Sequence, residues 1–192
     1  EGFLVSLKSL DSNTIASVCF AVEQTSPSRQ PALECSHGLG HGLLTRVGYD
    51  LTRALATCDY LGADDARGEC HDGVFMENVM HGLADSMITV GNAASTAHHQ
   101  MMEMSGASPH RAFFRKHDLA FPCDSVAAPY QSSCWSYQPL VAIQFTKANF
   151  QQTLHLCDKA IGAGATSCYR GFGKQSTGWY NNRGADIVRT CE

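Results

Sequence analysis

The stretch CDYLGADDARGECHDG, residues 58–73, sets the pattern from which the fold of this chain can be predicted. A cysteine followed by an acidic residue leads, after eleven residues, to a second cysteine that is followed by two residues and a glycine. A similar stretch, CDKAIGAGATSCYRG, occupies residues 157–171. Further copies are Cys123-Asp124 with Cys134, a looser one made by Cys19 and Cys35, and the beginning of another at Cys191-Glu192.

The distance between copies predicts helical hairpins. The second cysteine of one copy and the first of the next are 23 residues apart from Cys35 to Cys58 and again from Cys134 to Cys157. Self-similarity at 34 to 39 residues is typical of stacked helical pairs, because one hairpin cannot bury its apolar face alone. We therefore predict an all-α fold, a disulfide-stapled α/α-hairpin repeat array (α-solenoid) that forms one domain over residues 1–192 with an insertion at about 82–112.

We call each copy of this cysteine pattern a phrase. Pairing the two cysteines within each phrase predicts four disulfides, Cys19–Cys35, Cys58–Cys70, Cys123–Cys134 and Cys157–Cys168. Each bridge would close a loop of about a dozen residues, which is possible without strain and contributes about 3 kcal/mol in the chain-entropy model. No Cys-x-x-Cys occurs, which disfavours redox and zinc-ribbon sites. Disulfides indicate an oxidising compartment, so we expect an extracytoplasmic protein, either periplasmic, cell-surface or secreted.

Composition and the two ends of the chain narrow the function further. A net charge of −4, a pI near 6.1 and the lack of a Lys/Arg stripe argue against binding of nucleic acid. No run approaches eighteen apolar residues, so we expect no transmembrane segment in this chain.

The start at Glu1 suggests a processed chain. At the other end we expect either that the natural chain continues or that Cys191 pairs with another chain, the alternative being a free thiol.

Four side chains predict a metal site between neighbouring hairpins. His37 and His41 are four residues apart, as are Glu77 and His81, so each pair shares one face of a helix. If these helices pack side by side, the four side chains could converge on iron, copper or zinc. The glycines around His37 are poor helix formers, which indicates that a neighbouring helix or a cofactor comes close there. The alternative is that the four residues cap helices or form ordinary polar pairs.

The insertion holds a second cluster of potential metal ligands. His98, His99 and Met102 lie in a stretch where imidazole and thioether side chains recur at helical spacing. Such ligands suit copper in an oxidising compartment, and the alternative is that the methionines fill gaps in a core. A noncovalent haem is disfavoured, because nothing in the chain encloses or attaches a porphyrin recognisably.

The aromatic residues near the C-terminus favour a different function. Tyr169 follows Cys168, and Trp179 and Tyr180 come at the end of the helix expected there; these side chains could line the groove of a solenoid. Aromatic side chains are common anchors at protein interfaces, so a protein partner or self-assembly is the prediction here, with burial in the core as the alternative.

In architecture the chain resembles the disulfide-stapled helical repeats of the Sel1-like and tetratricopeptide type. Its spacing within each phrase is longer than in the cysteine-rich Sel1-like proteins, and the tetratricopeptide pattern of tryptophan, leucine-glycine and tyrosine does not occur in register. The resemblance therefore implies a class of fold and assigns no functional residue. Two hypotheses follow: a metalloprotein, which includes a metal-dependent or redox enzyme, and an interaction scaffold without a metal.

Overall fold

The computed structural model describes residues 9–88, 114–115 and 117–179, with positions 183, 185, 188 and 189 beyond them. All secondary-structure elements assigned in these ranges are α-helices, so the prediction of an all-α fold is confirmed. None of the described helices is long and apolar enough to cross a membrane. The chain divides into two compact units, Glu1–Phe113 and Phe114–Glu192. The repeat array as a single domain over 1–192 stays a prediction.

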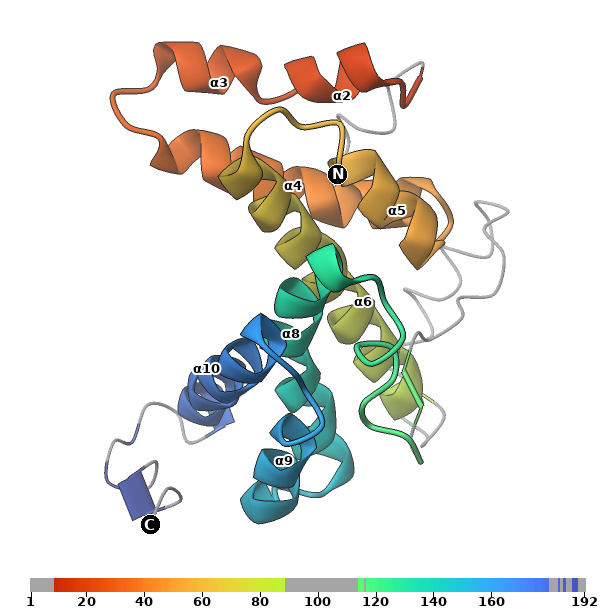
Figure 1. Ribbon diagram of the computed structural model, residues 1–192, viewed down its shortest axis with the longest axis vertical. Helices are drawn as coiled ribbons and strands as arrows, with labels where there is room; N and C mark the ends of the chain where they lie inside the picture. Colours follow the sequence, from red (N-terminus) through yellow and green to blue (C-terminus); the bar gives the residue numbers. More distant parts are fainter. Residues whose placement is uncertain are drawn as a thin grey trace. The chain divides into compact units, whose positions relative to one another are not determined.

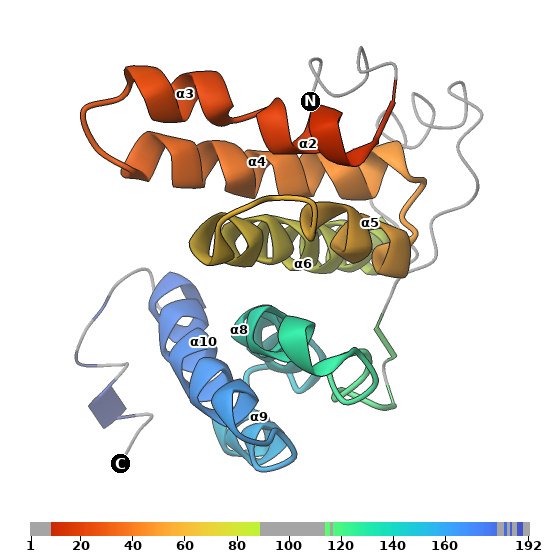
Figure 2. The same ribbon diagram turned by 45° about the horizontal axis from the view of Figure 1, so that its top comes forward.

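In unit 1 the longest described helices form one packed pair. The helices are α2 (Ser12–Ser17), α3 (Phe20–Thr25), α4 (Gln30–Arg46), α5 (Leu51–Cys58) and α6 (Asp64–Ile88). Figure 1 and Figure 2 show α2 and α3 running back along α4, which packs against α6. The core between them is aliphatic and aromatic, with side chains almost fully removed from solvent at Ile15, Leu39, Leu43, Leu44, Leu55, Val74 and Phe75.

The backbones of α4 and α6 touch at two glycines. A Cβ atom on Gly73 would lie 2.0 Å from the carbonyl oxygen of His37, and one on Gly40 would lie 2.0 Å from that of Cys70. No side chain tolerates such a distance, so only glycine permits this approach. The predicted close approach around His37 is therefore made by a neighbouring helix. Gly38, by contrast, has nothing within 4 Å of where its Cβ atom would be.

The turn between α4 and α5 places Tyr49 in a left-handed backbone conformation. Gly48 has φ 67° and Tyr49 has φ 63°, and the Tyr49 N–H donates to the carbonyl oxygen of Leu44 at 2.9 Å. Asp50 then begins α5, its carboxylate accepting from the backbone N–H of Arg53 at 3.0 Å. A left-handed conformation costs a residue with a side chain about 1–2 kcal/mol. The packing around the turn must therefore offset this cost.

Unit 2 is built on a second helix pair of the same kind. Its helices are α8 (Ala128–Phe145), α9 (Phe150–Cys157) and α10 (Ala163–Trp179). In Figure 1, α8 and α10 lie side by side. Trp135 is buried between them against Gly164, and a Cβ atom on Gly171 would lie 2.3 Å from the carbonyl oxygen of Ser136. Gly171 follows its cysteine by three residues, as Gly73 does in unit 1.

The turn between α8 and α9 has the geometry of the turn between α4 and α5. Ala148 has φ 62° and donates its N–H to the carbonyl oxygen of Ile143 at 2.8 Å, and Asn149 caps α9 by accepting from Gln152 at 3.0 Å. Ala148 follows Cys134 by 14 residues, and Tyr49 follows Cys35 by the same number. The left-handed conformation therefore accompanies this turn whichever side chain it carries.

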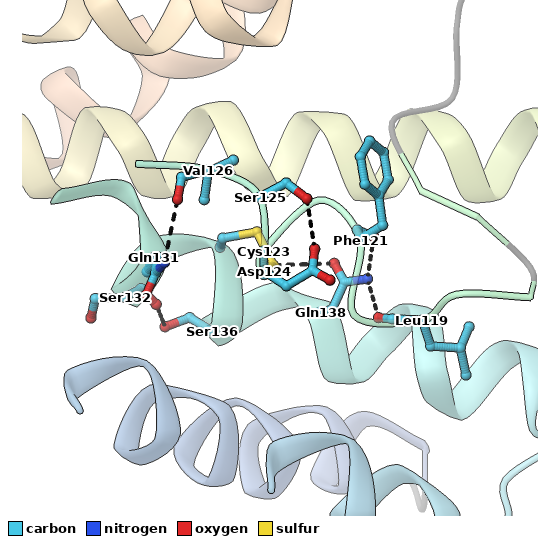
Figure 3. The surroundings of a disulfide bond; sticks show 11 residues. Leu119, Phe121, Cys123, Asp124, Ser125, Val126, Gln131, Ser132, Ser136 and Gln138 are labelled. Carbon is cyan, nitrogen blue, oxygen red and sulfur yellow. Dashed lines mark hydrogen bonds between the residues drawn. A yellow bond between two sulfur atoms is a disulfide. The ribbon is translucent and has the colours of Figure 1, made fainter. Parts of the chain in front are cut away.

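All four predicted disulfides are present, at sequence separations of 16, 12, 11 and 11. Figure 3 shows the surroundings of Cys123, where a buried glutamine holds the preceding loop onto α8. The Gln138 side chain donates from Nε2 to the carbonyl oxygens of Leu119 at 2.6 Å and Phe121 at 3.0 Å. Its amide therefore satisfies two backbone acceptors that the loop leaves without a helical partner.

A hydrogen bond accompanies two of the bridges. Asp59, directly after Cys58, lies 3.0 Å from Nε2 of His71, directly after Cys70. Asp158, directly after Cys157, accepts at 2.8 Å from the hydroxyl of Tyr169, directly after Cys168. The acidic residue of the phrase thus joins the same two segments that the disulfide joins. His71 is buried, and this burial lowers its pKa against the opposing effect of Asp59.

The contact between α4 and α6 gives a first prediction. We expect Gly73→Ala to destabilise the protein by several kcal/mol, because its Cβ atom would force two backbones apart. Gly38→Ala is the matched control in α4, where open space and the better helix propensity of alanine should stabilise by up to about 1 kcal/mol. Urea unfolding followed by circular dichroism measures both. Equal stability of the two variants would contradict the close contact.

The buried His71 gives a second prediction. Because its pKa in the folded protein is below 6.5, the unfolded chain takes up a proton that the folded chain resists as the pH falls. The free energy of unfolding should therefore decrease below about pH 6.5. His71→Gln keeps a donor toward Asp59 but cannot titrate, so its decrease between pH 7 and pH 5 should be smaller. Parallel pH profiles for the two proteins would show that His71 does not carry the effect.

Candidate functional site

The structure places the four predicted ligands in one connected cluster in unit 1. His41 on α4 lies with Nδ1 2.9 Å from Oε2 of Glu77 on α6. The ring of His37, one turn earlier on α4, has its centroid 5.1 Å from that of His41. His81, one turn after Glu77, reaches the cluster through Tyr49, whose hydroxyl lies 3.2 Å from Nδ1 of His81. Two helices and one turn thus supply the cluster.

Glu77 is the centre of these hydrogen bonds. A carboxylate only accepts, so His41 donates to Oε2, and the Tyr49 hydroxyl donates to Oε1 at 3.5 Å. That leaves the Tyr49 oxygen to accept from Nδ1 of His81. The hydrogen bond from His41 keeps the pKa of Glu77 below its usual value, although burial of the carboxyl opposes it. The arrangement therefore favours a charged Glu77 beside two imidazoles.

Two members of the cluster were missed by the sequence analysis. Tyr49 packs its ring against His81, with centroids 4.4 Å apart, and joins His81 to Glu77. Glu69 on α6 lies with Oε2 3.5 Å from Nδ1 of His37. Glu69 and Glu77 are eight residues apart, or about two helical turns, so they lie near the same face of α6. This spacing was the sequence signal that could have identified Glu69. No sequence signal pointed to Tyr49, because its place depends on the left-handed turn.

The cluster is half-buried, and its side chains contact one another. The side chains of His41 and Glu77 are 26% and 20% exposed. Across residues 9–88, 114–115 and 117–179, no three His, Cys, Asp or Glu side chains are placed to share one metal ion. A centre with His37, His41, Glu77 and His81 all as direct ligands therefore stays a prediction.

The corresponding positions of unit 2 do not repeat the cluster. Counted from the second cysteine of each phrase, Leu140 stands in the place of His41, Gln175 in that of Glu77, and Trp179 in that of His81. Ala148 stands in the place of Tyr49. Because unit 2 forms its helix pair without these side chains, the cluster is not needed to build such a pair.

The other predicted site residues are distributed as follows. His98, His99, Met102, Tyr180 and Cys191 lie outside the described residues. Trp179 is the last residue of α10. Tyr169 is 46% exposed, and its hydroxyl donates to Asp158.

Comparison of the chain with protein-family models, with curated proteins and with solved structures found no match.

Proposed function

We propose that this chain is an extracytoplasmic helical protein that binds a transition-metal ion at the cluster of unit 1, around His37, His41, Glu77 and His81. The observation that carries the proposal is the contact of His41 with Glu77, beside a second imidazole one turn away. Imidazole suits zinc, copper and iron, and a carboxylate is one of the usual partners, with backbone carbonyls and water, of the other ring N–H of a ligating histidine. The absence of the cluster from unit 2 supports a specialised role.

The bound ion would supply Lewis-acid or redox chemistry at the surface of α4 and α6. Four disulfides support an oxidising compartment, in the periplasm, at the cell surface or outside the cell. The equal offsets of the turns, glycines and carboxylates from their cysteines support the further proposal that the two units are copies of one stapled module. Such modules stack in helical-repeat proteins.

The alternative function is an interaction scaffold without a metal. The half-exposed ring of Tyr169 favours it, since aromatic side chains on a surface often anchor a partner. Under this alternative the protein would carry no ion, and Tyr169→Ala would weaken association while changes at His41 would not.

The metal proposal predicts that full-length protein, purified without chelator or affinity tag, contains zinc, copper or iron at close to one ion per chain. His41→Leu introduces the residue of the equivalent position in unit 2 and should lower the affinity for Zn²⁺ by about 100-fold or more, because a direct ligand is lost. Elemental analysis and isothermal titration calorimetry measure both quantities.

The matched control is His155→Ala. His155 also lies against a carboxylate, with Nδ1 3.2 Å from Asp158, but it is 69% exposed and belongs to unit 2. Its loss should leave the affinity unchanged. A wild-type protein that neither contains nor binds Zn²⁺ or Cu²⁺, or a His41→Leu variant that binds as wild type, would overturn the proposal.

A further inference from the structure

Each of the two histidines of α4 has Nδ1 beside a carboxylate of α6, His41 in a hydrogen bond and His37 in a longer ion-pair contact. His41 points Nδ1 at Glu77 at 2.9 Å, and His37 points Nδ1 at Glu69 at 3.5 Å. Both carboxylates come from α6, one turn before and one turn after Gly73. The Nε2 atom of each ring takes part in neither contact. The two imidazoles therefore form a pair in which each Nδ1 atom faces a carboxylate of the neighbouring helix.

A carboxylate at Nδ1 determines which nitrogen can bind a metal. In His41 the N–H of the neutral ring stays on Nδ1, where it donates to Glu77, and the lone pair stays on Nε2. Carboxylates in this position orient metal-binding histidines and raise their basicity. Glu77 thus leaves His41 in the form that coordinates an ion through Nε2, and Glu69, 3.5 Å from Nδ1 of His37, favours the same form of His37.

The separation of the rings fits a chelate. A zinc-bound imidazole nitrogen is about 2.0–2.1 Å from the ion, so the ring centroid is about 3.2 Å from it, and two rings at a tetrahedral angle have centroids about 5.2 Å apart. The His37 and His41 centroids are 5.1 Å apart. Two histidines four residues apart on a helix are also the zinc-binding pair of the His-Glu-x-x-His motif. Both side chains are 26% exposed, so the pair is partly open to solvent.

We infer that His37 and His41 chelate one divalent transition-metal ion through their Nε2 atoms, with Glu69 and Glu77 as outer carboxylates and not as ligands. This inference rests on the proposed metal-binding function and identifies its ligands. His81 lies beyond Glu77, reached through Tyr49, and supports the carboxylate without touching the ion. Two protein ligands leave the remaining positions to water or an external ligand. The site takes Zn²⁺, Cu²⁺ or Fe²⁺, and not Ca²⁺ or Mg²⁺, which prefer oxygen ligands.

The chelate is tested with Cu²⁺ and Zn²⁺ on the full chain and four variants. His37→Ala should lose affinity to the same extent as His41→Leu, and His81→Ala should stay within about two-fold of wild type. Glu69→Gln should weaken binding by about ten-fold, at the low end for an outer carboxylate because its contact is long and exposed. Electron paramagnetic resonance of the Cu²⁺ protein should show two coupled imidazole nitrogens, and one in His37→Ala. Circular dichroism checks that each variant folds.

Two results would overturn the inference, and they differ from each other. Binding that survives in His37→Ala but is lost in His81→Ala would place the ion on the other side of Glu77, so the chelate would fall while the metal-binding function stands. A wild-type protein that binds neither ion would remove the proposed function and the chelate together. Weakened binding in His37→Ala and Glu69→Gln, with wild-type binding in His81→Ala, supports the chelate.

Discussion

The backbone contact between α4 and α6 is the constraint on which the rest of unit 1 depends. Gly40 and Gly73 allow two helices to meet with no side chain between them. Residues one turn from this contact are therefore brought within reach of the opposite helix. On α6 these are Glu69 and Glu77, which meet the histidines of α4. A wider helix separation would break both pairs at once, because an imidazole and a glutamate together span only a limited gap.

Much of the fold could be predicted because its determinants are local in the sequence. Each cysteine pair is close along the chain, so the phrase spacing was sufficient to assign all four bridges. The 23-residue interval between copies was sufficient to predict a helical hairpin, which α4 and α5 form in unit 1 and α8 and α9 form in unit 2. The role of the acidic residue in the phrase was not predicted, although the residue was visible. Its hydrogen bond to the residue after the second cysteine depends on how the loop closes, as Asp59 and Asp158 show.

The candidate site could be predicted only in part. His41 and Glu77 followed from two helical pairs of residues and the assumption that their helices pack together. Glu69 depends on the register of that packing, which one sequence does not reveal. Tyr49 lies in the turn after α4, in a left-handed conformation that a glycine would adopt with less strain. The parts that escaped prediction are thus those that arise from the meeting of two segments.

The short sequence separations of the disulfides bear on how the chain acquires them. Every bridge joins cysteines 11 to 16 residues apart, so each correct partner is the nearest one along the chain. Closing a short loop takes little time compared with thiol oxidation, and the correct pair meets more often than any other. A chain that emerges into an oxidising compartment from its N-terminus could therefore close its bridges one after another. Its oxidative folding would require little reshuffling by a disulfide isomerase.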